Sequence, residues 1–225
     1  MTAQRSSARP IGAAHAPDID LEQLEAIAVE SLQAQFDLED VLLCAASLPD
    51  TNAGSGRFKR VHLKDVELGA SKLRAVQLAD VLAERVEAAN GDWGGAQLRR
   101  TLVSDARLTG LDLAEAHFED VSFKGCKLDY ANFRHSTIER VSFEDCVLTG
   151  ADFQGARIHL TLFSRCQLQG ADFSKAELSL VDLRSSELSF AGSVLGLRGA
   201  IIDPLQLMEL APALAQELGI TVEHS

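Results

Sequence analysis

Large apolar residues recur at every fifth position along most of this chain. The series keeps one register from Phe58 to Leu188, over 27 quintets, with Leu, Phe, Ile or Val at nearly every step. A second set of smaller residues, mainly Ala, Val and Cys, stands two positions before each large one. Each quintet therefore follows the order small, polar, large, polar, polar, and a repeat architecture has to be considered before any other.

A period of five excludes an α-helix. Five residues advance about 500° around a helix axis, so the apolar set would drift by about 140° per quintet and spread over every face. A strand explains three of the five positions as inward, outward, inward, because its side chains alternate. The other two positions must turn the chain. Glycine recurs at the fifth place, for example at Gly110 and Gly150, where a turning backbone benefits from its dihedral freedom.

A second, longer period of twenty residues, equal to four quintets, is also present. Residues 121–140, 141–160 and 161–180 align position by position. If four quintets close one square turn, residues twenty apart stack at about 4.8 Å, the spacing of neighbouring strands. The predicted structural core then contains homogeneous columns: Phe123, Phe143 and Phe163; Phe133, Phe153 and Phe173; and Cys126, Cys146 and Cys166.

Three segments carry a recognisable motif: Ala131-Asn132-Phe133, Ala151-Asp152-Phe153 and Ala171-Asp172-Phe173. They resemble the A(D/N)LXX quintets of the pentapeptide-repeat family. The resemblance implies an all-β fold, a right-handed quadrilateral parallel β-helix. The register extends back to Leu38, so we expect about 7–8 coils over residues 36–195. Residues 1–19 are expected to be a disordered tail, 20–35 a helical capping segment and 196–225 a helical cap.

The C-terminal cap has its own helical signals. Asp203 and Pro204 supply an N-cap and a first-turn proline, and Pro212 is expected either to kink the segment or to divide it into two short helices. The apolar stripe consists of Leu207, Leu210, Leu214 and Leu218. Repeat proteins cap their terminal units, so this stripe is either a hydrophobic cap or a homodimer interface.

The composition of the chain limits which classes of function are possible. The chain has 225 residues, a formal charge of −12 and no run of 18 apolar residues. The acidic balance disfavours direct nucleic-acid binding, and a membrane span is not expected. The N-terminus lacks the apolar core of a secretory leader, so a cytoplasmic location is expected.

Catalytic or metal chemistry is not indicated by the sequence. Cys126, Cys146 and Cys166 occupy one inward column, which core packing explains, whereas Cys44 falls outside the inward set. The six histidines form no metal-binding spacing, and there is no phosphate loop or nucleophile elbow. We therefore expect no enzyme activity, no metal and no cofactor.

Two outward features are candidate partner sites. Asp92, Asp112, Asn132, Asp152 and Asp172 form an acidic column, which either imitates a line of phosphates or satisfies turn backbone by local hydrogen bonds. Tyr130 and Phe190 lie on the same face as each other, with Gly150 and Gly170 between them, and are candidates for a shallow partner patch.

Two functions of different class follow. The first is a non-catalytic structural or protein-binding module with an unknown protein partner. The second comes from the family resemblance: some pentapeptide-repeat proteins imitate B-form DNA, bind DNA gyrase or topoisomerase IV and confer fluoroquinolone resistance. The charge distribution weakens the second, because residues 57–195 carry a net charge of only −2, against −7 in residues 1–56 and −3 in residues 196–225.

Overall fold

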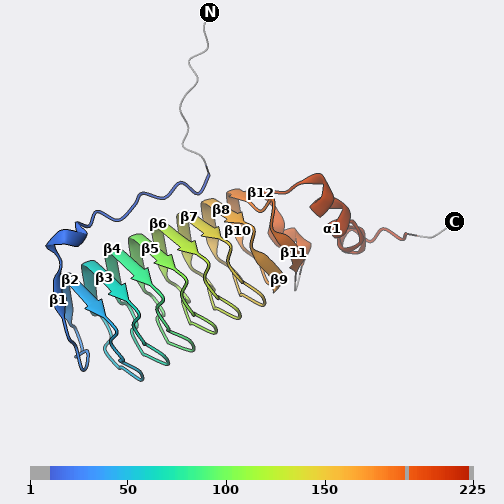
Figure 1. Ribbon diagram of the computed structural model, residues 1–225. Coiled ribbons are helices and arrows are strands. Elements are labelled where there is room, and N and C mark those ends of the chain that lie inside the picture. Colours follow the sequence, from blue (N-terminus) through green and yellow to red (C-terminus); the bar gives the residue numbers. More distant parts are fainter. Residues whose placement is uncertain (1–10, 191–192, 223–225) are drawn as a thin grey trace, which may run out of the picture.

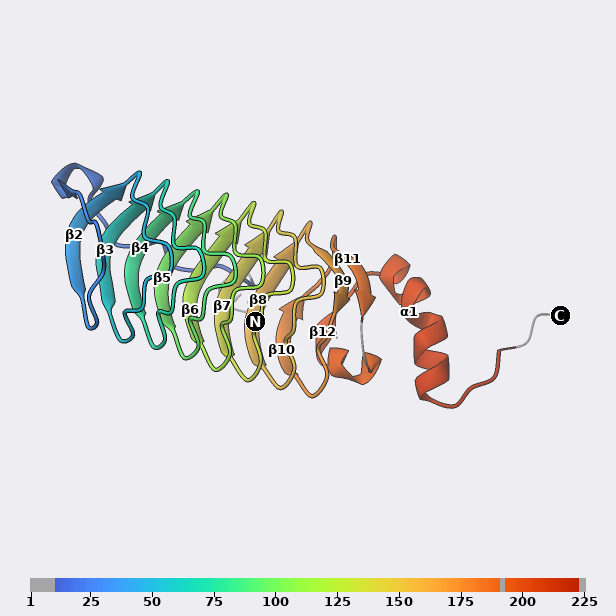
Figure 2. The same cartoon turned by 90° about the horizontal axis from the view of Figure 1, so that it is seen from below.

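The computed structural model describes residues 11–190 and 193–222, without the side chains of Ser189 and Phe190. Figure 1 shows stacked coils that form a straight rod, with a helix at the C-terminal end and the N-terminal segment lying along the rod. Figure 2 shows the same stack from below. The rod makes about nine turns, slightly more than the 7–8 coils expected, because short strands at both ends add rungs.

A ten-stranded parallel sheet, in the order β1-β2-β3-β4-β5-β6-β7-β8-β10-β12, covers two adjacent faces of the rod, because each eight-residue strand turns a corner at its fourth residue. A second, two-stranded sheet pairs β9 with β11. The strands are β1 Glu25–Ile27, β2 Asp37–Cys44, β3 Arg57–Lys64, β4 Gln77–Glu84, β5 Gln97–Ser104, β6 His117–Lys124, β7 Thr137–Glu144, β8 Arg157–Ser164, β9 Gln167–Ala171, β10 Glu177–Asp182, β11 Glu187–Phe190 and β12 Ala200–Ile201. The helical elements are η1 Leu21–Gln23, η2 Val194–Leu197 and α1 Pro204–Glu217.

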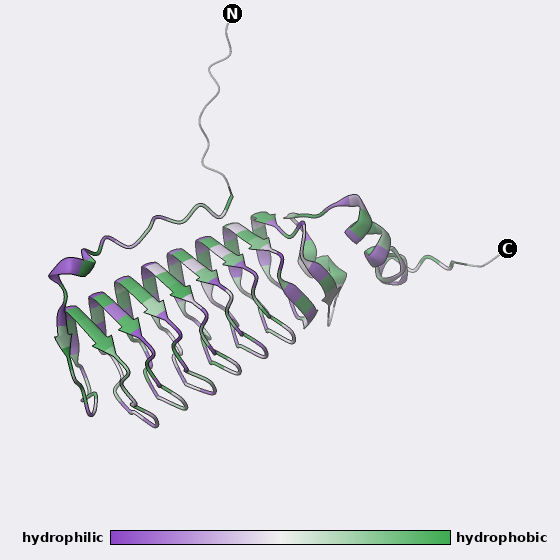
Figure 3. Ribbon diagram, viewed as in Figure 1, coloured by the Kyte–Doolittle hydropathy of each residue, from purple (hydrophilic) through white to green (hydrophobic). Residues whose placement is uncertain are grey.

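The period of twenty is confirmed by the strand register. Partners between consecutive long strands are twenty residues apart, as in Leu38↔Phe58, Phe58↔Leu78 and Leu98↔Phe118. The small and large positions of the quintets are buried and the other positions face outward, so hydropathy alternates along the coils (Figure 3). The expected quadrilateral β-helix is confirmed.

The phenylalanine columns are stacked ring on ring. The ring centroids of Phe133 and Phe153 are 4.7 Å apart at an interplanar angle of 4°, and Phe153 and Phe173 are 4.8 Å apart at 7°. Phe143 and Phe163 stack in the neighbouring column and meet the first column edge to face. Aromatic pairs in these geometries contribute about 0.5–1.5 kcal/mol each beyond their burial.

The cysteine column is also part of the core. Cys126, Cys146 and Cys166 are buried free thiols, and each Sγ lies 3.3–3.5 Å from a carbonyl oxygen of the preceding coil. Their burial and mutual contact raise the pKa of the central thiol, Cys146. Cys44 is exposed, as its position outside the inward set predicted.

Every fifth residue from Gln35 to Ser185 has a positive φ. Six of these corners are glycines, but 25 are other residues, with φ between 46° and 66°. The corner therefore demands the left-handed conformation at each quintet, whatever residue stands there. Glycine also makes room for its neighbour: a Cβ at Gly150 would lie 2.7 Å from the ring of Tyr130, one coil earlier.

The core is incompletely filled around Trp93. A cavity of about 30 Å³ there is lined by Ala83, Trp93, Leu63 and other apolar side chains, so the large indole only partly offsets the missing bulk of Ala83. The Trp93 indole N–H donates to the Ser71 hydroxyl at 3.1 Å, which satisfies the one polar atom of the ring.

The N-terminal end of the rod differs from the helical cap expected over residues 20–35. Only η1 is helical, and β1 then pairs with β2 and continues the sheet. Leu32 is buried, and the ring of Phe36 packs on Phe58 at 4.7 Å. The helical prediction was wrong because the open edge of β2 bonds a further strand, β1, through its backbone groups.

The C-terminal cap is one helix, so of the two expectations for Pro212 the division into two helices is wrong. Helix α1 begins with a capping box in which Asp203 accepts from the backbone N–H of Gln206 and the Gln206 side chain accepts from the Asp203 N–H. Pro212 lies inside α1 without ending it. A proline removes one intrahelical hydrogen bond, and contacts with the rod compensate for that loss.

Residues 11–19 also differ from the expectation of disorder. They lie extended along the outside of the ten-stranded sheet, from the level of β8 back to η1 (Figures 1 and 2). We call residues 11–19 the strap. The rest of the predicted tail, residues 1–10, lies outside the described residues.

Candidate interaction surfaces

The acidic column exists as predicted. Parallel bridges join consecutive members from Asp92 to Asp172. In each of them, a side-chain oxygen accepts the backbone N–H of the residue two positions on, at 2.8–3.1 Å. The column therefore has a structural role in the turns, because these oxygens satisfy donors that the corner leaves without a backbone partner.

Two of the column's four carboxylates are paired with arginines, and a third accepts from a neutral amide. Arg74 donates to Asp92 at 2.9 Å, and Arg134 donates to Asp152 at 2.7 Å. The Asn132 amide donates to Asp112 at 2.9 Å. An incoming partner that sought a row of free carboxylates would have to displace these donors.

Acids elsewhere on the rod pair with arginines one coil further on. Arg85 bonds Asp65 at 2.6 Å, and Arg165 bonds Asp145 at 2.7 Å. The hydrogen bonds from these guanidinium groups lower the pKa of both carboxyls. The same spacing of twenty joins Asp37 to Arg57, Asp40 to Arg60, Asp80 to Arg100 and Asp120 to Arg140.

Tyr130, whose side chain is 68% exposed, rests over Gly150, and the outward residues on the two coils after it include an uncharged group bordered by Asp129, Lys127 and Glu187. We call Tyr130 and this uncharged group the Tyr130 patch. It consists of Tyr130, Val147, Thr149, Gly150, Gln167, Gln169 and Gly170. The side chain of Phe190, the other predicted aromatic, lies outside the described residues.

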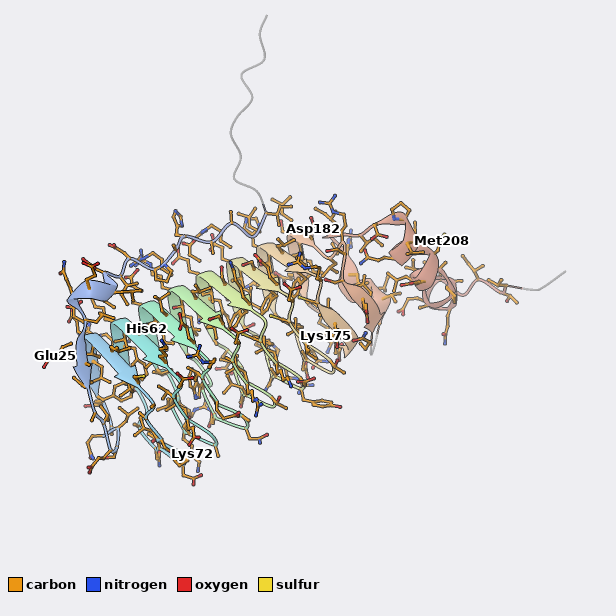
Figure 4. All side chains as sticks on the ribbon, viewed as in Figure 1. Glu25, His62, Lys72, Lys175, Asp182 and Met208 are labelled. Atoms are coloured by element: carbon orange, nitrogen blue, oxygen red, sulfur yellow. The ribbon has the colours of Figure 1, made fainter. Side chains whose placement is uncertain are left out.

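The predicted stripe of α1 divides into two sets. Leu210 is buried and Leu214 half-buried against the end of the rod, whereas Leu207 and Leu218 are exposed. Met208 is 72% exposed and lies on the outer side of the helix (Figure 4). The leucine stripe thus caps the rod with two members and leaves two for solvent or a partner.

Sequence reasoning missed the polar anchor of this helix. The buried Gln206 side chain donates to the carbonyl oxygens of Leu183 and Ser186, both at 2.8 Å. These carbonyls lie at the C-terminal end of the rod, so this one side chain fixes the start of α1 to the end of the stack. The capping-box spacing from Asp203 to Gln206 was the signal in the sequence.

Two arrangements that a metal-dependent or membrane-spanning role would use are absent from the described residues. Within residues 11–190 and 193–222, no group of three or more His, Cys, Asp or Glu side chains is placed to hold a metal ion. No helix in the same part of the chain is long and apolar enough to cross a membrane.

Comparison with known proteins agrees with this architecture. The models for the pentapeptide repeat region and for pentapeptide repeats (8 copies) match residues 116–191 and 94–129. The solved structure of HetL, a pentapeptide-repeat protein from the cyanobacterium Nostoc sp. strain PCC 7120, matches with a TM-score of 0.51 at 20% identity, covering 75% of this chain and 84% of HetL.

More distant or partial matches were also found. The structure of QnrB1, a plasmid-mediated fluoroquinolone resistance protein, gives a TM-score of 0.45 at 19% identity over 88% of this chain and 95% of QnrB1. The Bacillus subtilis (strain 168) protein YisX is 27% identical over 114 residues. This match covers 51% of each chain, so the present chain spans about half the length of that curated relative.

The fold is thus a parallel β-solenoid of square coils with five-residue sides. The two family models identify residues 94–191 of this chain as pentapeptide repeats.

Proposed function

We propose that this protein is a non-catalytic module that binds a protein partner through the Tyr130 patch. The observation that carries the proposal is the exposed Tyr130 beside a group of uncharged outward residues on an otherwise charged rod. Tyrosine is enriched at protein interfaces, where it supplies a large contact area for little lost side-chain freedom, and charged residues are depleted at interface centres.

The interior of the rod supports a non-catalytic role. Stacked side chains fill it, and the cavity beside Trp93 holds about 30 Å³, far below the volume of an ordinary small-molecule site. The outward side chains are instead spaced regularly along flat faces, which is the arrangement that solenoid proteins use to bind extended partner surfaces.

We further propose that α1 pairs with α1 of a second copy. Its outer side and the following residues expose an apolar set: Leu205, Leu207, Met208, Leu218, Ile220 and Val222. Burial of such a set against its own copy would give a two-fold dimer, the commonest symmetric assembly. The double variant Leu207→Glu with Met208→Glu should then sediment as a monomer under conditions where the unaltered protein is a dimer. Monomeric behaviour of the unaltered protein at 100 µM would refute the pairing.

The alternative is a DNA mimic that acts on gyrase or topoisomerase IV. The acidic column and the overall charge of −12 favour it. The arginine and amide partners of Asp92, Asp112 and Asp152 count against it, because locally balanced charge produces a weaker field than free phosphates do.

The patch is tested by comparing captured proteins. The unaltered protein, Tyr130→Ser and the control Asn90→Ser would be used as baits in an extract of the source cells, with mass spectrometry as readout. Asn90 occupies the same corner two coils earlier. The proposal predicts a partner that is retained by the unaltered protein and the control and is lost with Tyr130→Ser. Equal capture by all three proteins would refute the patch.

A further inference from the structure

The strap is held at three points by groups of the rod. The backbone N–H of Gly12 donates to the carbonyl oxygen of Leu160 at 3.0 Å. The backbone N–H and the ring Nδ1 of His15 both contact Asp120 Oδ1, at 3.2 and 2.8 Å. The backbone N–H of Asp18 donates to Asp80 Oδ1 at 2.9 Å.

The three contacts are evenly spaced, both along the strap and along the rod. Each advance of three residues along the strap, from 12 to 15 to 18, moves back two coils along the rod, from 160 to 120 to 80. Three extended residues span about 10 Å, and two coils span about 9.6 Å at the strand spacing. The spacing of every third residue in the extended strap therefore matches the spacing of every second coil at this corner.

The corner column of the rod has the same two-coil period. It contains Asp40, Arg60, Asp80, Arg100, Asp120 and Arg140, so a carboxylate recurs at every second coil and an arginine lies between carboxylates. We call Asp80, Arg100, Asp120 and Arg140 the anchor column. Each arginine donates to the aspartate one coil earlier. The distance from Arg100 Nε to Asp80 Oδ1 is 2.5 Å, and that from Arg140 Nε to Asp120 Oδ1 is 3.1 Å.

The two anchor carboxylates are buried under the strap. The side chains of Asp80 and Asp120 are only 8% and 7% exposed, although their position in the quintet faces outward. Burial disfavours the charged form of Asp120, but hydrogen bonds from His15 and Arg140 outweigh it and lower the pKa. Each carboxylate is thus held ionised by an arginine and has an oxygen directed at the strap.

The first contact point is specific for glycine. Gly12 has φ +75°, and a Cβ there would lie 2.4 Å from the Cβ of Leu162. A larger residue cannot approach the Leu160 carbonyl closely. The residue at position 18 must have a backbone N–H, which excludes proline there.

We propose that the anchor column is a peptide-binding track for an extended segment of a partner protein, and that the strap occupies it in the resting chain. The partner segment that fits this track has three anchoring residues, each three positions after the one before. The first is a glycine, the second has a backbone N–H and a histidine-like side-chain donor, and the third has a free backbone N–H. This segment runs opposite to the order of the coils. The track lies two quintets away from the Tyr130 corner, so it does not depend on the function proposed for that patch.

The test uses full-length chains and a fluorescent decapeptide with the sequence of Ile11–Asp20. In the unaltered protein, the tethered strap competes at a high effective concentration, so the free peptide should bind weakly. The variant Gly12→Leu weakens the protein's own strap, and fluorescence anisotropy should then show at least tenfold tighter peptide binding. The control Ala16→Leu alters an exposed strap residue and should bind the peptide as weakly as the unaltered protein.

A second pair of variants locates the site. In the Gly12→Leu background, Asp120→Asn should weaken peptide binding at least tenfold, because a neutral amide accepts the His15 contacts less strongly. Asp145→Asn, at another corner and bonded to Arg165, should leave binding unchanged. Circular dichroism checks that every variant is folded. Equal binding to the unaltered protein and to Gly12→Leu, no binding to Gly12→Leu at 1 mM protein, or equal binding with and without Asp120→Asn would each overturn the proposal.

Discussion

The left-handed corners allow a prediction in which the usual effect of glycine on stability is reversed. Ala75 and Gly95 occupy the same corner of consecutive coils, with φ values of 54° and 70°. Ala75 is exposed, and no atom lies within 4 Å of a Cβ built on Gly95. Exchanging alanine and glycine at these two positions therefore changes backbone preference with little effect on packing.

The magnitude follows from two opposing terms. The left-handed conformation costs an L-residue about 1–2 kcal/mol, a cost that glycine avoids. Glycine also makes the unfolded chain more flexible, which costs about 0.4–1 kcal/mol. Ala75→Gly should therefore stabilise the rod by about 0.5–1 kcal/mol, and Gly95→Ala should destabilise it by a similar amount.

A control separates the corner effect from flexibility alone. Ala79 lies in β4 and is not among the residues with positive φ. Ala79→Gly should destabilise the protein by about 0.5–1 kcal/mol, the ordinary cost of glycine within a strand or helix.

Urea denaturation measures all three variants. The midpoints are compared at equal m-values, because a changed m-value would indicate that the coils no longer unfold together. The reasoning is refuted if Ala75→Gly and Ala79→Gly shift the midpoint in the same direction by similar amounts.

Three further predictions concern the core and the anchor column. Phe153→Asp should abolish folding, because it places an unpaired charge between stacked rings, while the outward Gln154→Asp should leave the circular dichroism spectrum and melting temperature nearly unchanged. Ala83→Val should fill part of the cavity beside Trp93 and stabilise the rod by about 1 kcal/mol in urea, whereas Ala88→Val, at a fully buried site that does not line the cavity, should destabilise it by about 1–3 kcal/mol. The folded-state pKa of Asp120 is lowered, so its charged form contributes stability above its unfolded pKa of about 3.9, and this contribution is lost as the pH falls through the folded value. Asp120→Asn should therefore be less stable than the unaltered protein at pH 6 and should lose less stability between pH 5 and pH 2.

Each of these three has a contradicting result. Equal loss of folding in Phe153→Asp and Gln154→Asp would mean that the inward register is wrong. Destabilisation by Ala83→Val as large as by Ala88→Val would mean that the cavity is already collapsed in solution. Parallel acid-unfolding curves for Asp120→Asn and the unaltered protein would mean that the Asp120 carboxylate does not contribute through its ionised form.

The regular part of the rod was predictable because its signal is additive. Each quintet places one large residue inward, and 27 quintets in one register leave no competing fold with the same burial. The phenylalanine and cysteine columns follow from that register alone. The acidic column was also predictable as a geometric feature, and the hydrogen bond from Asp152 to the Gln154 N–H shows why the motif uses Asp or Asn there.

The ends were harder to predict because tertiary contacts determine them. Residues 24–28 have a helical apolar spacing, but the open edge of β2 offers hydrogen bonds that favour β1. The strap has almost no apolar pattern, since backbone N–H groups hold it at Asp80 and Asp120. The alternation of Asp and Arg every twenty residues in the anchor column was visible in the sequence, but its meaning depends on the segment that lies across it.

The central claim is that this rod binds a protein partner without imitating DNA. Gyrase supercoiling should be assayed with purified protein, with and without a fluoroquinolone, beside the double variant Asp152→Lys with Asp172→Lys. We expect no inhibition and no drug protection up to tens of micromolar, because two of the column's four carboxylates, Asp92 and Asp152, are paired with arginines within the rod. Inhibition at micromolar protein that is lost in the double variant would contradict the account and identify the acidic column as a DNA-mimicking face.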